Sequence, residues 1–252
     1  MSRRPAIRLA QLSDLHLVGE AAPLPFGQDS AASLAAVVDA FPARPDVAVM
    51  TGDLADDGSI EAYHRIHGLT ADLADEVHSV PGNHDDPAAM YELLGGSDAL
   101  RVVRLSRSWT MLLVNSQWSG HDAGRISPET LAALDEALAK TKQHVIVSMH
   151  HPPASTCDDP YCGIVNSEEI LRVLHRGQRV RAVLSGHLHR AFDNHRDGIR
   201  FLGAPSTCRQ LTHGGVPHFA PTSAPPAARL FDLHRDGTIT YETVSARYAH
   251  AG

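Results

Sequence analysis

The stretch DVAVMTGD, residues 46–53, is the most informative segment for the fold, because four apolar residues lead directly into Thr-Gly-Asp. A short apolar run that is closed by a turn is typical of a buried β-strand. Four other segments have the same character, and each is followed by a polar or glycine-containing turn. They are AIRLAQL (6–12), EVHSV (76–80), HVIVSM (144–149) and VRAVL (180–184).

The residues between the predicted strands carry helix signals. Asp29 or Ser30 can cap a helix that ends near Pro42, and Pro128 occupies the first turn of another, which runs to about Lys142. The remaining predicted helices cover residues 59–73, 87–94 and 167–176. Strands that alternate with helices indicate an α/β fold.

The pattern changes towards the C-terminus, where strands follow one another without helices. Asp197-Gly198 and Asp236-Gly237 are typical hairpin turns. The C-terminal strands are predicted at residues 191–195, 199–203, 228–234 and 238–244. An earlier pair of adjacent strands is predicted at residues 100–105 and 110–115. Residues 213–226 are rich in Gly, Pro and Ser and are predicted to form a long loop. No repeat or linker divides the chain, so we expect a single domain over residues 1–252.

The composition and charge of the chain argue against several kinds of partner and site. The formal charge is −7, from 22 basic and 29 acidic residues, which argues against a nucleic-acid polymer or a membrane surface as partner. No apolar stretch approaches the ~20 residues of a membrane helix, and Asp14 interrupts any signal-peptide core, so we expect a cytoplasmic protein. Three cysteines are too few for a disulfide framework, and Cys157 and Cys162 are expected to be free thiols.

Polar clusters follow five of the predicted strands. They are Asp14-Leu15-His16, Gly52-Asp53, Gly82-Asn83-His84-Asp85, His150 and Gly186-His187-Leu188-His189. Each alone is an ordinary turn sequence. In open α/β sheets, however, ligands bind beyond the carboxyl ends of the strands, so the ordered set predicts one site.

The ligand chemistry of this set predicts two metal ions. Asp14, His16, Asp53 and His189 give one carboxylate–imidazole shell, and Asp53, Asn83, His150 and His187 give a second. The shared Asp53 carboxylate can bridge two cations. The absence of cysteine argues against a closed structural zinc site. Two adjacent metals form a clamp for displacement at phosphorus.

The order of these motifs resembles that of the calcineurin-like metallophosphoesterases. The local sequences are similar to those of bacterial class III cyclic-nucleotide phosphodiesterases of the CpdA type. The segments that carry this similarity are QLSDLHL (11–17), TGDLADDG (51–58), VPGNHD (80–85), MHHPP (149–153), SGHLHR (185–190) and GAPSTCRQL (203–211). The resemblance covers nearly the whole chain and implies a four-layer α/β/β/α sandwich of two mixed β-sheets flanked by helices.

The resemblance also implies roles for individual residues. Asp14, His16, Asp53 and His189 would hold the first metal, often iron, and Asp53, Asn83, His150 and His187 the second, often manganese; zinc or cobalt suits the same ligand types. His150 is preferred to His151, because the family ligand is the first histidine of HHPP. His84 would lie over the phosphate as an acid or charge stabiliser, and it would act with Asp53 and Asn83 as the catalytic residues. Asp85 would orient His84 or a backbone group, or cap the helix that begins at Pro87.

The expected activity is hydrolysis of cyclic AMP to the 5′-monophosphate, with hydroxide held between the two metals as nucleophile. One alternative is a broader phosphodiesterase or phosphomonoesterase that acts on glycerophosphodiesters, 2′,3′-cyclic nucleotides or other small esters. Another is a non-catalytic scaffold like the retromer subunit, which predicts missing ligands or a lost histidine. The expected partner is a small phosphodiester; a homodimer and the native metals stay open.

Overall fold

The computed structural model describes residues 7–97, 99–154, 162–212 and 219–246. Its five helices within these ranges are α1 (Ser30–Asp39), α2 (Ile60–Thr70), α3 (Pro87–Leu94), α4 (Pro128–Lys140) and α5 (Ser167–Arg176), preceded by a short 3₁₀ turn, η1 (Pro25–Gly27). The strands are β1 (Ile7–Leu12), β2 (Val47–Thr51), β3 (Glu76–Val80), β4 (Leu100–Val103), β5 (Trp109–Val114), β6 (His144–Ser148), β7 (Val180–Ser185), β8 (Phe192–Arg196), β9 (Ile199–Gly203), β10 (Ala227–Leu233) and β11 (Ile239–Ser245).

Helices α1, α2, α3 and α4 each begin after a residue whose side chain caps the helix. Asp29 caps α1 through a hydrogen bond from Ala32 N, and Ser59 caps α2 in the same way. Pro87 opens α3, whose cap is Asp86. Each cap satisfies a backbone N–H that has no partner inside the helix.

The strands form two mixed sheets. The first has the order β11-β10-β1-β2-β3 and the second the order β4-β5-β6-β7-β9-β8. β1, β2 and β3 are parallel to one another, as are β5, β6, β7 and β9. The hairpin strands β10 and β11 and the edge strands β4 and β8 run antiparallel to their neighbours. The predicted β-only segment therefore completes both sheets.

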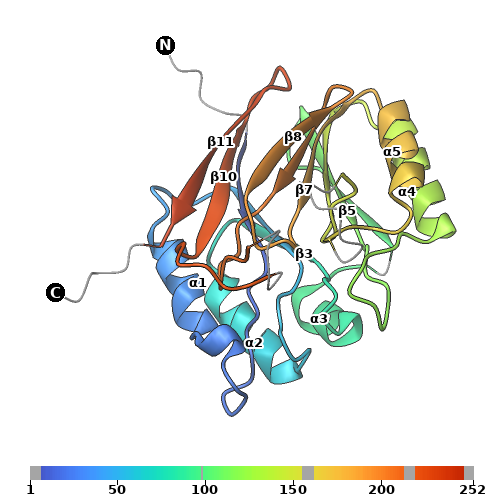
Figure 1. Ribbon diagram of the computed structural model, residues 1–252. Helices are drawn as coiled ribbons and strands as arrows, with labels where there is room; N and C mark the ends of the chain where they lie inside the picture. Colours follow the sequence, from blue (N-terminus) through green and yellow to red (C-terminus); the bar gives the residue numbers. More distant parts are fainter. Residues whose placement is uncertain (1–6, 98, 155–161, 213–218, 247–252) are drawn as a thin grey trace.

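Three apolar clusters lie between successive layers. Leu9, Val49 and Ile146 belong to the cluster between the two sheets. Leu34 and Tyr63 join α1 and α2 to the outer face of the first sheet, with α3 beside them, while α4 and α5 cover the second sheet. Figure 1 shows the resulting succession of helices, sheet, sheet and helices. The predicted four-layer architecture is confirmed.

Most predicted elements agree with the structure, and the differences are small. The ranges predicted for α3, α5, β3 and β9 match the observed ones, whereas α1, α2 and α4 end two to three residues earlier than expected. The turn η1 was not predicted. Cys162 is disulfide-bonded, which corrects the expectation of a free thiol; Cys157 lies outside the described residues. Among the described helices, none is both long and apolar enough to cross a membrane.

Candidate metal centre

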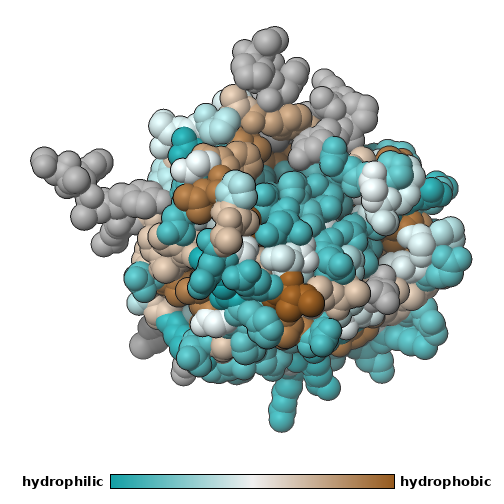
Figure 2. All heavy atoms as spheres, turned by 90° about the horizontal axis from the view of Figure 1, so that it is seen from below, coloured by the Kyte–Doolittle hydropathy of each residue, from teal (hydrophilic) through white to brown (hydrophobic). Residues whose placement is uncertain are grey.

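The polar segments predicted from the sequence lie together at the carboxyl ends of the parallel strands. Asp14 N donates to Gly52 O at 3.0 Å, and His84 N donates to Asp53 Oδ1 at 3.0 Å. His187 N donates to Asp14 Oδ1 at 2.8 Å and so joins the second sheet to the first. The face at which β1, β2 and β3 end is mainly hydrophilic, with scattered hydrophobic patches (Figure 2).

The first group consists of Asp14, His16, Asp53 and His189. All four are buried, and one potential ligand atom from each lies within 4.8 Å of those of the others. His16 Nε2 is 3.8 Å from Asp53 Oδ2, and His189 Nε2 is 3.8 Å from Asp14 Oδ1. The structure therefore brings together the complete set that was expected to hold the first metal.

The second group extends from the same Asp53 carboxylate. His150 Nε2 lies 3.3 Å from Asp53 Oδ2 and 3.2 Å from Asn83 Oδ1. The rings of His150 and His187 pack edge to face, with their centroids 5.1 Å apart. Asp53 thus contacts members of both groups, as a bridging ligand would.

The hydrogen bonds of His16 and His189 indicate that a cation fits between them. His16 Nδ1 donates to Asp56 Oδ1 at 2.7 Å, and His189 Nδ1 donates to the carbonyl oxygen of Arg209 at 2.7 Å. In the neutral rings, both Nε2 atoms then carry lone pairs, and these atoms face each other at 2.9 Å. Asp14 Oδ2 is buried beside them and has no hydrogen-bond partner in the described part of the chain. Converging lone pairs of this kind suit a metal ion.

His150 shows the same arrangement. Its Nδ1 donates to the carbonyl oxygen of Thr51 at 2.7 Å, and its Nε2 faces Asn83 Oδ1 at 3.2 Å and Asp53 Oδ2 at 3.3 Å, so in the neutral ring the Nε2 lone pair would be offered to a metal ion held by these oxygens. A carbonyl that fixes the tautomer of a histidine is a common support for a metal ligand. The donors present therefore fit two metal ions.

The electrostatics of the centre favour positive charge next to Asp53. Burial opposes ionisation of this carboxyl most strongly, but the charge and hydrogen bond of His150, together with the charges of His16 and His84, hold the pKa of Asp53 well below its usual range. In turn, burial opposes protonation of His150, yet Asp53 raises the pKa of His150 to about 9. Burial and the charge of His16 lower the pKa of His189 to about 3. A cation placed beside Asp53 is thus stabilised.

The backbone of the centre is strained. Five of the predicted ligands adopt the left-handed conformation, with φ between 47° and 70°: Asp14, His16, Asp53, His187 and His189. This region is uncommon for residues other than glycine, although Asp, Asn and His enter it more often than most. Unusual backbone geometry that the surrounding hydrogen bonds enforce is frequent at functional sites.

Two glycines of the motifs permit the close approach of the loops. A Cβ on Gly82 would lie 2.2 Å from Asp53 Oδ1, and a Cβ on Gly52 would lie 2.4 Å from His150 Nδ1. Gly52 also has a φ of +89°. Both glycines are therefore required by space, and Gly52 also by its turn geometry.

His84 lies beside the two groups with its ring partly exposed. Its Nδ1 contacts the carbonyl oxygen of Asp56 at 3.2 Å and the carboxylate Oδ1 at 3.5 Å. Its ring packs on His16 with the centroids 4.8 Å apart. His84 is 37% exposed, whereas His16 is 2% exposed, so it can meet a substrate that the buried imidazoles cannot.

Asp56 is a residue of the centre that the sequence reasoning missed. Its carboxylate accepts the hydrogen bond from His16 Nδ1, and it faces His84 as well. The signal was its place in TGDLADDG, three residues after Asp53.

Asp85 acts on the backbone rather than on His84 or on the α3 cap. Its buried carboxylate accepts hydrogen bonds from the N–H groups of Leu54, Ala55 and Gly82 and from the hydroxyl of Tyr63. It therefore fixes the loop after β2 against the loop after β3. Of the roles expected for Asp85, orienting a neighbouring backbone group is the one observed, and Asp86 supplies the cap.

His151 lies near His150 and His187, but both of its ring nitrogens are occupied by hydrogen bonds. Its Nε2 donates to the carbonyl oxygen of Asp122 at 3.0 Å, and its Nδ1 accepts from Ser116 Oγ at 2.9 Å. These contacts agree with the preference for His150 as the ligand.

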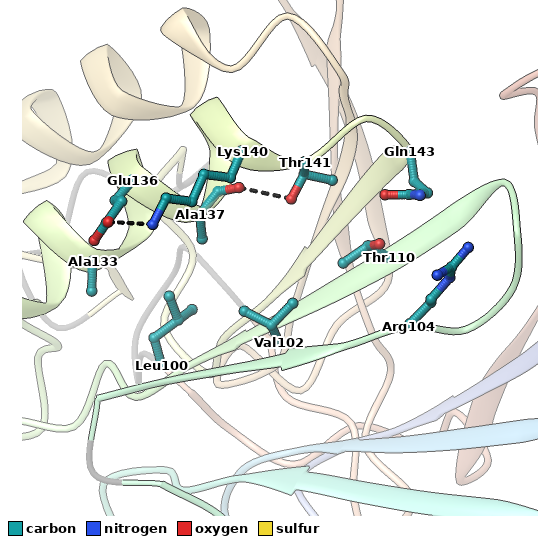
Figure 3. A pocket seen from close by; sticks show the side chains of 10 residues that line it. All are labelled: Leu100, Val102, Arg104, Thr110, Ala133, Glu136, Ala137, Lys140, Thr141 and Gln143. Carbon is teal, nitrogen blue, oxygen red and sulfur yellow. Dashed lines mark hydrogen bonds and ion pairs between the residues drawn. The ribbon is translucent and has the colours of Figure 1, made fainter.

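A separate groove of about 490 Å³ lies between β4 and α4, away from this centre (Figure 3). Leu100 and Val102 of β4 face Ala137 of α4 across it, and Glu136 pairs with Lys140 along its rim. None of the predicted site residues lines this groove, so we place the function at the strand ends.

Two sheets that bring carboxylates, imidazoles and an amide together at their strand ends define a class of metal-dependent phosphoester hydrolases. The chain belongs to the calcineurin-like phosphoesterase family, whose model matches residues 7–191. The family and the enzyme class predicted from the sequence are confirmed, and the family uses two metal ions.

Relatives of known name are similar along most of the chain. A 3′,5′-cyclic-nucleotide phosphodiesterase from Nostoc sp. is 33% identical over 99% of this chain and 96% of the relative. The 3′,5′-cyclic adenosine monophosphate phosphodiesterase CpdA from Escherichia coli K12 is 35% identical over 94% and 88%, respectively. The predicted function agrees with these names.

Solved structures share the fold at low sequence identity. A dimetal phosphatase from Danio rerio superposes with a TM-score of 0.68 at 16% identity, over 96% of this chain and all of the other. A purple acid phosphatase from yellow lupin gives 0.62 at 12% identity, over 98% of this chain and 55% of the other.

Proposed function

We propose that the protein hydrolyses 3′,5′-cyclic nucleotides, and cyclic AMP in particular, to the 5′-monophosphate. The observation that carries this proposal is the pair of ligand groups that share Asp53, with His84 partly exposed beside them. The named activities of the relatives support the choice of substrate.

Each residue of the centre has a proposed role. Asp14, His16, Asp53 and His189 hold one metal ion, and Asp53, Asn83, His150 and His187 hold the other. Iron in the first position and manganese in the second suit these donors, as do zinc and cobalt. When bound, two such ions lower the pKa of water towards ~7 and neutralise charge on the phosphoryl oxygens.

The reaction needs a proton at the leaving oxygen, and we assign it to His84. Water adds its oxygen to phosphorus while the bond from phosphorus to the ribose 3′ oxygen breaks. His84 in its imidazolium form, held at Nδ1 by Asp56, donates the proton from Nε2 to that oxygen. A proton from the attacking water restores the balance, and the product is the 5′-monophosphate.

A panel assay with Mn²⁺ tests the proposal. It compares cyclic AMP, 2′,3′-cyclic AMP, a glycerophosphodiester and bis-(p-nitrophenyl) phosphate. We expect the highest kcat/KM with cyclic AMP. A higher value for the glycerophosphodiester or the 2′,3′-cyclic nucleotide identifies the broader phosphodiesterase instead. No hydrolysis of any ester by protein that carries two metals per chain identifies a scaffold.

The charge of the chain bears on the kind of substrate. With seven more acidic than basic residues, the protein is not suited to a nucleic-acid polymer, whose phosphates require a basic surface. The substrate is therefore proposed to be a small phosphodiester. A cytoplasmic location stays a prediction.

A further inference from the structure

Phe26 lies at the edge of the candidate metal centre. Its ring centroid is 5.8 Å from those of both His16 and His189, with ring planes at 82° and 75° to it. The two imidazoles are buried, whereas Phe26 is 44% exposed. The phenyl ring is therefore a wall of the centre that a bound substrate can also contact.

The backbone at Phe26 is strained. It has φ 52° and ψ 19°, in the left-handed region, which a bulky residue rarely adopts. That conformation is unfavourable for a residue with a side chain, because its Cβ crowds the following carbonyl oxygen. A large apolar side chain that is left half exposed by a strained backbone is not explained by core packing. Strain of this kind clusters at ligand sites.

The turn that carries Phe26 is tied to the ligands of the first metal. Gly27 N donates to Leu24 O at 3.1 Å, which closes the turn. Arg209 Nη1 donates to Gln28 Oε1 at 3.1 Å, and the carbonyl oxygen of the same Arg209 accepts the hydrogen bond from His189. Phe26 is thus held in a fixed position relative to His189.

Open space for a ligand adjoins this turn. A cavity of about 460 Å³ begins at Gly27 and Gln28, directly after Phe26, and reaches Arg209. Its size is within the range of small-molecule sites.

We propose that Phe26 binds the nucleobase of the substrate by stacking, and so selects nucleotides among phosphodiesters. This inference rests on the proposed function. Every nucleobase presents a π face, and stacking of a base on an aromatic side chain contributes ~1–3 kcal/mol. Because the turn that carries Phe26 is already fixed, the ring would make this contact without a further loss of conformational entropy in that turn.

The test compares two substrates that differ only in the base: cyclic AMP and a base-free ribose 3′,5′-cyclic phosphate. Phe26→Leu keeps an apolar side chain but removes the π face, and Phe26→Tyr keeps the π face as the matched control. We expect Phe26→Leu to lower kcat/KM for cyclic AMP by about 5- to 100-fold, mainly through KM, and to change the base-free substrate less than about twofold. Phe26→Tyr should resemble the wild type on both.

A binding measurement gives a readout besides activity. Calorimetry should show weaker binding of 5′-AMP to Phe26→Leu by a similar factor, with little change for ribose 5-phosphate, while metal content stays at the wild-type value. Equal losses on both substrates, or loss of metal, overturn the proposal and leave Phe26 as packing for the imidazoles. Wild-type protein that is inactive on every cyclic nucleotide contradicts the proposed function itself, and this inference with it.

Discussion

The backbone N–H of His187 donates a 2.8 Å hydrogen bond to Asp14 Oδ1, although the two residues are 173 positions apart in the sequence. Asp14 follows β1 of the first sheet, and His187 follows β7 of the second. The centre therefore exists only when both sheets are formed and packed.

Asp53 is expected to be the ligand common to both metals. Asp53→Ala removes a donor from both positions, so metal content should fall below one ion per chain and activity should be lost. His16→Ala should weaken mainly one position. Elemental analysis of the purified variants checks this, with Asp135→Asn, on the outer helix α4, as the control. Two tightly held metals in Asp53→Ala would falsify the bridging role.

Chelation should remove activity while the fold persists. The apolar clusters between the layers do not depend on metal, so we expect the circular dichroism spectrum to stay unchanged after chelator treatment. Mn²⁺ should then restore hydrolysis. Unfolding upon chelation would instead assign the metals a structural role.

His84 should matter most for a poor leaving group. The 3′ alkoxide of cyclic AMP is strongly basic, so His84→Ala should lower kcat about 10²–10⁴-fold on this substrate. On bis-(p-nitrophenyl) phosphate, whose phenolate leaves without a proton, the loss should be much smaller. Metal content should not change. Equal losses on both substrates would place the action of His84 on the non-bridging phosphoryl oxygens.

Asp56 should control the affinity for the first metal. Its carboxylate holds the Nδ1 proton of His16, and loss of such a supporting contact typically costs 10- to 100-fold in metal affinity or activity. Asp56→Ala should show this loss in a metal titration. The neighbouring Asp57→Ala is the control, because Asp57 contacts backbone N–H groups outside the centre. Similar affinities in both variants contradict the role of Asp56.

Asp85 should contribute more to stability than the adjacent Asp86. Asp85→Ala leaves three backbone N–H groups of the loops without their acceptor, which should cost about 3 kcal/mol or more. Asp86→Ala removes only the cap of α3, worth ~1 kcal/mol. Urea denaturation of the two variants measures the difference. A larger loss in Asp86→Ala would show that the loops do not depend on Asp85.

Much of the fold could be predicted from the sequence because apolar periodicity and caps are local signals. Ser59 and Asp29 cap helices that begin where they were expected, and β3 and β9 have their predicted bounds. The division of the strands between two sheets is not a local property; the two-sheet architecture followed from the family resemblance, and the order of the strands within each sheet was not predicted.

The residues of the centre were predicted because each follows a strand and carries a ligand atom. Their supports were harder to foresee. Asp56 and the carbonyl oxygen of Arg209 orient His16 and His189. The position of Asp56 in TGDLADDG was its one sequence signal, whereas a backbone carbonyl in a loop gives none. Phe26 was not predicted either, since its proposed role depends on a turn whose conformation brings it against His189, 163 positions away.

The left-handed backbone at five ligand positions sets a limit on protein engineering. Outside glycine, this conformation is most accessible to Asp, Asn and His, which are also hard or borderline metal donors. Libraries that exchange these three residue types at Asp14, His16, Asp53, His187 and His189 can therefore vary charge and donor type on an unchanged backbone. Valine, isoleucine or threonine at the same positions would meet steric resistance before any question of coordination arises. The range of metals that this scaffold can be evolved to accept is thus restricted by its torsion angles.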